Sequence, residues 1–182
     1  MFDLLSKKEA LTNLLIEGVR KFELDHPCIK WSCVAFDSCP WMGWVALNFD
    51  TTEKSNSIVS QFQHNGPAWY CEDENGRFNN NCTDFKYCEF VKLEIPEWYE
   101  TYDSLGDDFH LNYIDSNGQK KVLDLDAEGD EGLNKIVFPL LKSIMTENRQ
   151  KIIDLAKNRD TISRLGVQMC DSECEYFESL SI

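Results

Sequence analysis

The residues of this chain that could do chemistry are mostly carboxylates, and they are concentrated in one stretch. The formal net charge is −14. Residues 94–131 hold twelve carboxylates against only Lys120 and Lys121, which leaves a net charge of −10 in about a fifth of the length. Such an uneven field attracts cations, so it predicts a protein partner with a basic surface and argues against nucleic acid and anionic membranes. The acidic residues that we expect in the partner-binding surface are Asp107, Asp108, Asp124, Asp126 and Asp130.

Residues 124–129 resemble the opening of a calcium-binding loop. Asp124, Asp126 and Glu128 occupy positions 1, 3 and 5, and Gly129 stands at position 6. Position 12 requires a glutamate that closes the coordination shell, but Lys135 occupies it here. We therefore expect no metal ion and no other cofactor. The segment is interpreted as an acidic, solvated loop that leads into the N-terminus of a helix.

Eight cysteines and three histidines supply the other reactive side chains. No C-x2-C pair occurs, so the strongest signature of structural zinc is absent. A cysteine–histidine nucleophile pair stays open, because such partners are neighbours in space and not in sequence. A G-x-S-x-G elbow, a Walker A loop and a dinucleotide glycine pattern are all missing. The prediction is a binding protein and not an enzyme, with a small enzyme using a cysteine or carboxylate near residues 65–88 as an alternative.

Aromatic residues provide a second candidate binding element. Residues 65–83 contain two glycines, a proline and three consecutive asparagines, which predicts a long loop. Trp69 and Tyr70 lie within it, and an exposed aromatic beside acid is suited to anchor a partner. We therefore include Trp69 and Tyr70 in the candidate partner-binding surface, although buried packing is the common role of tryptophan.

Length and composition predict one cytoplasmic domain over residues 1–182. Hydrophobic residues make up 42% of the chain, enough to build a core despite the charge. No run approaches the length of a membrane span. The first residues carry Asp3 and Glu9 where an export signal would be basic and then apolar. Reduced cysteines are therefore expected, with Cys33 acting as a small core residue.

Hydrophobic periodicity predicts the elements that must position these residues. Helices are expected over 6–24 (with Ser6 and Glu9 at capping-box spacing), over 51–64, from Pro96, and after Leu133 with a start or kink at Pro139. Strands are expected over 31–36, 42–49, 85–95 and 165–170, and a hairpin over 109–125 turns at Asn117-Gly118. Asp37-Ser38-Cys39-Pro40 is typical of a turn. Together they predict an α+β fold, a mostly antiparallel sheet packed against an N-terminal helix and C-terminal helices.

The order of these segments resembles an uncharacterised bacterial family of unknown function that occurs among the immunity proteins of polymorphic toxin systems. Three stretches carry the likeness: Val34-Ala35-Phe36-Asp37 with Ala46-Leu47-Asn48-Phe49-Asp50-Thr51, the Phe90–Glu100 stretch with Ile95-Pro96-Glu97-Trp98, and the closing Leu165–Asp171 strand with its acidic tail. The resemblance implies an α+β fold and neutralisation of a toxin by direct binding. It supplies no functional residues. A housekeeping adaptor without a toxin partner is a further alternative.

Overall fold

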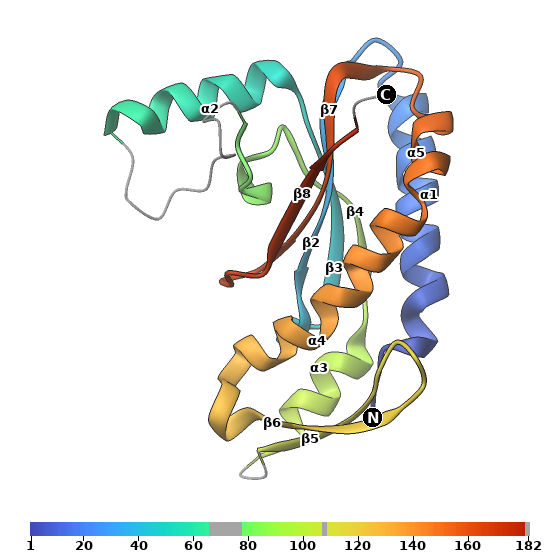
Figure 1. The fold of residues 1–182 in the computed structure, drawn as a ribbon, viewed down its shortest axis with the longest axis vertical. Helices are drawn as coiled ribbons and strands as arrows, with labels where there is room; N and C mark the ends of the chain where they lie inside the picture. The colour runs from blue at the N-terminus through green and yellow to red at the C-terminus, as the bar shows by residue number, and fades with distance from the viewer. Residues whose placement is uncertain (66–77, 107–108, 181–182) are drawn as a thin grey trace.

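The computed structural model describes residues 1–65, 78–106 and 109–180, which form two sheets and a layer of helices (Figure 1). The helices are α1 (Lys8–Asp25), α2 (Thr52–Asn65), α3 (Pro96–Asp103), α4 (Leu125–Glu147) and α5 (Arg149–Leu155). The strands are β1 (Phe2–Asp3), β2 (Trp31–Cys39), β3 (Trp44–Asp50), β4 (Tyr87–Glu94), β5 (His110–Ile114), β6 (Lys120–Asp124), β7 (Arg159–Met169) and β8 (Glu175–Ser179). Short 3-10 turns are η1 (Leu5–Lys7), η2 (Pro40–Met42) and η3 (Cys82–Asp84). The α+β prediction is confirmed.

The large sheet has the strand order β4-β3-β2-β7-β8, and its central pair, β2 and β7, is parallel. The other three pairings of this sheet are antiparallel. The small sheet has the order β1-β5-β6, with β1 parallel to β5. It lies with α3 at one end of the molecule, close to the N-terminus (Figure 1).

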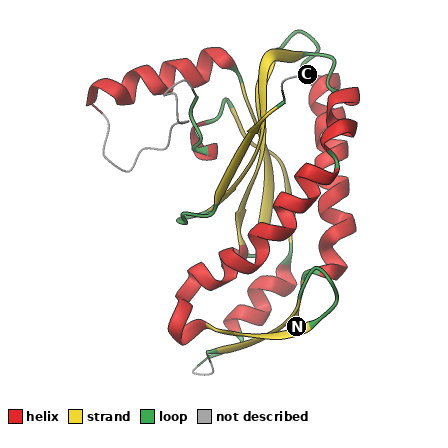
Figure 2. Cartoon of the chain, in the orientation of Figure 1, coloured by secondary structure: helices red, strands yellow, loops and turns green. Residues whose placement is uncertain are grey.

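Strand β2 contributes buried side chains to both faces of the large sheet. All nine of its residues are buried, and its side chains alternate between the faces. Val34 and Phe36 belong to the main core, whereas Cys33 and Ala35 pack on the opposite face against the η3 segment. Helices α1, α4 and α5 lie on the main-core side of the sheet and α2 lies on the other side (Figure 2). The second face is therefore only partly covered, and it carries the site described below.

Helix α1 packs on the sheet through the stripe that its sequence predicts. Leu11, Leu15, Val19 and Phe22 are fully buried, and the Phe22 ring stacks on Phe49 with 4.0 Å between centroids. The predicted capping box is wrong, because no side chain caps α1. The chain already turns at η1, so the hydroxyl of Ser6 donates to the Asp3 carbonyl and its N–H donates to the Asp3 carboxylate.

The predicted turn at Asp37-Ser38-Cys39 is also wrong, because β2 continues through Cys39. Pairing with β3 on one side and β7 on the other holds these residues in the sheet. The turn follows at η2 and ends at Gly43, whose φ of 69° favours glycine. A Cβ on Gly43 would lie 2.7 Å from the carbonyl oxygen of Ile95. Asp37 therefore lies in a buried strand, near its end, and not in the predicted turn.

Two further elements differ from the sequence prediction. The α4 segment begins at Leu125, well before the predicted start, and consists of two helical pieces joined by a kink at Gly129 (φ 57°, ψ −157°). Pro139 lies inside the helix and does not begin it. The acidic tail after residue 170 forms β8, an antiparallel partner of β7. Among the described residues, no helix is both long and apolar enough to cross a lipid bilayer.

Candidate functional site

The structure brings three of the predicted partner-binding residues together at the start of α4. Asp107, Asp108, Trp69 and Tyr70 lie outside the described residues. Asp124 caps α4, since its carboxylate accepts the N–H groups of Asp126 at 3.1 Å and Ala127 at 3.3 Å. Residues 125–128 therefore form a helical turn where a loop is predicted, and the backbone kinks at Gly129 before the longer part of α4 begins. The side chain of Asp126 is exposed.

Asp130 accepts a short hydrogen bond from the Tyr102 hydroxyl, which raises the pKa of Tyr102 to about 12. It lines a groove of ≈ 350 Å³ between α3 and α4. Phe109, 47% exposed, also lines this groove. Within the described part of the chain, no three histidine, cysteine or acidic side chains gather as a metal site would require. We refer to the exposed carboxylates of this region as the acidic end: Glu94, Glu97, Glu100, Asp103, Asp124, Asp126, Glu128 and Asp130.

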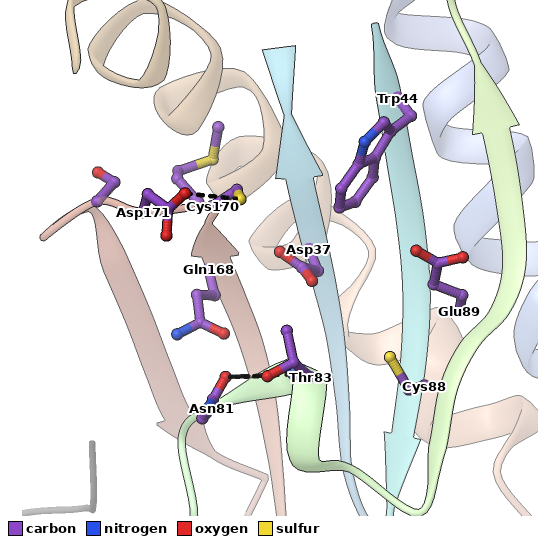
Figure 3. Close-up of a pocket in the computed structure, with 11 residues that line it drawn as sticks. Asp37, Trp44, Asn81, Thr83, Cys88, Glu89, Gln168, Cys170 and Asp171 are labelled. Atoms are coloured by element: carbon purple, nitrogen blue, oxygen red, sulfur yellow. Dashed lines mark hydrogen bonds between the residues drawn. The ribbon is translucent and has the colours of Figure 1, made fainter. Parts of the chain in front are cut away.

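A larger concavity, which we call the sheet cleft, lies on the second face of the large sheet (Figure 3). Its volume is ≈ 460 Å³. Carboxylates, amides, hydroxyls and thiols converge on it from five segments of the chain. The residues that line it are Asp37, Trp44, Asn81, Thr83, Cys88, Glu89, Gln168, Met169, Cys170, Asp171 and Ser172.

The register of the large sheet builds the floor of the cleft. Asp37 in β2 pairs with Gln168 in β7 on one side and with Ala46 in β3 on the other. Paired residues project to the same face of a sheet, so the three side chains form one row. The short side chain of Ala46 leaves room beside Asp37. Gln168 also ties the η3 wall to the floor, because its Oε1 accepts the N–H of Cys82 at 2.7 Å.

Asp37 is the most unusual residue of the cleft. It is 4% exposed, and burial raises its pKa from 3.8 to about 6. A hydrogen bond from the Ser38 N–H opposes this rise, whereas the negative charge of Glu89 adds to it. Lys92, whose positive charge lowers the pKa of Asp37, is already paired with Glu89 at 3.7 Å and Glu94 at 3.4 Å. Among the described residues no ion pair forms with Asp37, so its charge is poorly compensated.

Backbone strain is concentrated in the same place. Glu89 (φ 47°) and Asp171 (φ 49°) are the two non-glycine residues with positive φ in the described part of the chain, and both line the cleft. Glu89 sits where the β3–β4 register is irregular, and its N–H donates to the Asn48 side chain. Non-glycine residues adopt a positive φ at a cost of about 1 kcal/mol or more, and such outliers cluster at functional sites.

The cleft and the acidic end are connected through the β7–β8 turn. The Ser172 hydroxyl donates to Glu131 at 2.9 Å, and the Asn134 amide donates to the Cys170 carbonyl at 3.3 Å. These contacts hold the turn, which carries Asp171 and Glu173, beside the first half of α4. The turn therefore brings Asp171 and Glu173 close to Glu131 of α4.

Sequence reasoning missed Asp37, Glu89 and Asp171 as site residues. The alternation of Cys33, Ala35 and Asp37 could have revealed that Asp37 continues a strand, but the following serine, cysteine and proline favour a turn.

No family model, curated protein or solved structure matches this chain. The chemistry of the site therefore has to be argued from its own residues. A cleft with a buried carboxylate at its floor and two more carboxylates at its rim is suited to hold a cation.

Proposed function

We propose that this chain is a cytoplasmic binding protein that captures a basic protein partner, and that it acts as an immunity protein by neutralising a toxin. One observation carries the proposal: the buried carboxylate of Asp37 faces an accessible cleft and forms no ion pair with any of the described residues. A buried charge is costly unless an opposite charge meets it. A lysine or arginine side chain of the partner, inserted into the sheet cleft, would supply that charge.

The acidic end would guide the partner to the cleft. Asp103, Asp124 and Asp126 are exposed and form no ion pair with other described residues, so their field reaches the solvent. Complementary charge accelerates encounter, and the effect weakens as salt rises. Nuclease toxins need cationic surfaces to hold their phosphate substrate, so an acidic inhibitor suits them. That the partner is a toxin is what the sequence resemblance implies.

A capture experiment with matched variants tests this proposal. The wild-type chain is used as bait in its source cells, the retained protein is identified by mass spectrometry, and its toxicity is measured with and without co-expression of the chain. The purified pair is then compared across three triple variants, each neutralising three carboxylates. The cleft variant is Asp37→Asn, Glu89→Gln, Asp171→Asn; the acidic-end variant is Asp103→Asn, Asp124→Asn, Asp126→Asn; and the control is Glu9→Gln, Glu53→Gln, Asp154→Asn.

The cleft variant should weaken binding at least about thirtyfold, mainly through faster dissociation, because it removes the partner of a buried cation. The acidic-end variant should slow association at low salt and have little effect at high salt. The control should change neither rate by more than about twofold. A partner without a basic surface would contradict the proposal. So would a cleft variant that binds and neutralises as well as the wild type.

The same cleft favours a second candidate, a small enzyme. Thr83 and Cys88 line it together with Asp37, within or beside the region near residues 65–88 that the sequence predicts for a catalytic alternative. A carboxyl group with a pKa of about 6 can act as a general base near neutral pH. A hydrolase screen with ester, amide and phosphoester substrates would detect such an activity. It should disappear in both Asp37→Asn and Cys88→Ser if this candidate is right.

A further inference from the structure

Two cysteines stand side by side where the two central strands end. Ser38 of β2 pairs with Met169 of β7 in the parallel register. Cys39, the last residue of β2, and Cys170, which directly follows β7, come next along each chain segment. The N–H of Cys170 donates to the Ser38 carbonyl at 2.8 Å, so the two backbones are still joined at this point. Neighbouring strands lie about 4.8 Å apart. That spacing falls within the range of about 4.4–6.8 Å between Cα atoms that a disulfide can bridge.

Both side chains project to the face of the sheet that carries the cleft. Cys39 lies two residues after Asp37, and Cys170 lies two residues after Gln168, so each repeats the orientation of a cleft residue. The Cys170 thiol donates to the Asp171 carboxylate at 3.7 Å, and the Cys39 thiol is close enough to add to the rise that burial causes in the pKa of Cys170. Cys170 lines the cleft and is partly exposed, whereas Cys39 is 1% exposed. A small reagent that enters the cleft can therefore reach Cys170 first.

The other described cysteines are less suited to pair with either of these two. The Cys174 thiol contacts Glu131 of α4 at 3.4 Å and packs against the main core, on the opposite side of the sheet. Cys33 of β2 and Cys82 of η3 are fully buried in one cluster with Ala35 and Phe85. Cys88 lies on the far side of Asp37 in the cleft (Figure 3).

We propose that Cys39 and Cys170 are a redox pair that closes to an intramolecular disulfide when the protein meets a low-molecular-weight disulfide such as oxidised glutathione. The pair is a modification site in the wall of the sheet cleft. It goes beyond the proposed partner binding and does not depend on it, because the reaction requires only the chain and the oxidant.

The reaction balances in two exchange steps. The deprotonated Cys170 attacks one sulfur of oxidised glutathione, which forms a mixed disulfide and releases one glutathione thiolate. The deprotonated Cys39 then attacks the Cys170 sulfur, forms the protein disulfide and releases the second glutathione thiolate. The two protons that the cysteines lose end on the two glutathiones. Two protein thiols are oxidised, and one glutathione disulfide is reduced.

The surroundings of the pair make the exchange slow at neutral pH. Burial raises the pKa of Cys39, and burial together with the neighbouring Cys39 and Asp171 raises that of Cys170 to about 12. Asp37 also faces both thiols and opposes their ionisation. Because the thiolate is the attacking species, the initial rate should rise about tenfold for each pH unit between 7 and 9. Under reducing conditions the pair stays open.

The test is to incubate the reduced, full-length protein with oxidised glutathione, block the remaining thiols with N-ethylmaleimide, and map crosslinked peptides by tandem mass spectrometry. We expect a Cys39–Cys170 crosslink that dithiothreitol reverses. Sequencing of the fragments separates this link from links through Cys33 or Cys174, which share the same tryptic peptides. The mapping uses the wild-type protein, so its outcome does not depend on a variant that folds.

Matched variants sharpen the result. Cys170→Ser and Cys39→Ser should both abolish the crosslink, whereas Cys174→Ser and Cys88→Ser should leave its rate within about twofold. The proposal is overturned if Cys170 pairs with Cys174, if only intermolecular links through Cys28 or Cys88 form, or if Cys170 stays glutathionylated without ever transferring to Cys39.

Discussion

Replacing Asp37 by asparagine should stabilise the protein at neutral pH and have almost no effect near pH 4. Asparagine has nearly the same volume and keeps an oxygen for the Ser38 N–H, so the substitution removes little more than the ability to ionise. Asp37 is almost fully buried, and no described cation is paired with it. Its ionised form should therefore destabilise the folded state.

The sign and size follow from the raised pKa. In the unfolded chain Asp37 ionises near its ordinary pKa of 3.8, whereas in the folded protein it ionises near 6. Between these values the folded state holds a proton that the unfolded state has released, so stability falls as pH rises from about 4 to about 6. Above that window the full cost is present. It amounts to about 3 kcal/mol, because each pH unit corresponds to about 1.4 kcal/mol.

Thermal melting at pH 4.0 and at pH 7.5 measures this effect. At pH 7.5 the melting temperature of Asp37→Asn should exceed that of the wild type by about 6–12 °C, at about 2–4 °C for each kcal/mol. At pH 4.0 the two should nearly coincide. Asp154→Asn, a substitution on the exposed surface of α5, is the control and should shift neither curve by more than about 1–2 °C. A variant that melts at or below the wild-type temperature at pH 7.5 would show that the folded protein stabilises the Asp37 charge.

Further predictions concern strain, packing and cysteine chemistry. Glu89→Gly should raise the free energy of unfolding by about 1 kcal/mol in urea titrations, whereas Glu89→Ala, which keeps the strained φ, should not. Gly166→Ala should lower the free energy of unfolding by about 1–3 kcal/mol, because a Cβ at this position would lie 2.2 Å from the Phe177 ring. The double variant Gly166→Ala, Phe177→Leu should recover part of this loss. Thiol titration of the denatured, unreduced protein should find most of the eight cysteines free; four stable disulfides would contradict the proposed cytoplasmic location. Melting temperature should change little with chelator or millimolar calcium, and a saturable calcium-dependent rise would reveal a site near Asp124, Asp126 and Glu128.

The sequence predicts well those elements whose signals are local. The hairpin β5–β6, the helix that starts at Pro96 and the apolar stripe of α1 each depend on residues within a short window, and the structure confirms them. The signal at the start of α4 is also local. Asp124 caps a helical turn there, whereas the calcium-loop spacing of Asp124, Asp126 and Glu128 favours a loop.

The candidate site could not be predicted because distant segments assemble it. Asp37 stays in a strand only because β7, more than a hundred residues later, pairs alongside it. Its local sequence favours a turn, so tertiary pairing overrides propensity here. The left-handed conformations of Glu89 and Asp171 likewise have no signature in their residue types. The role of Asp107, Asp108, Trp69 and Tyr70 in partner binding stays a prediction.

The parallel pairing of β2 with β7 also sets a limit on how early the chain can fold during synthesis. Until Arg159–Met169 has left the ribosome, the nascent chain has α1 and the antiparallel strands β2, β3 and β4 but lacks the strand that pairs with the second edge of β2. That edge is apolar, and an unpaired apolar edge readily recruits strands from other chains. Contacts between residues so far apart in sequence also form slowly. A chaperone that shields nascent chains should therefore raise the yield of this protein. A chain truncated before residue 159 should aggregate.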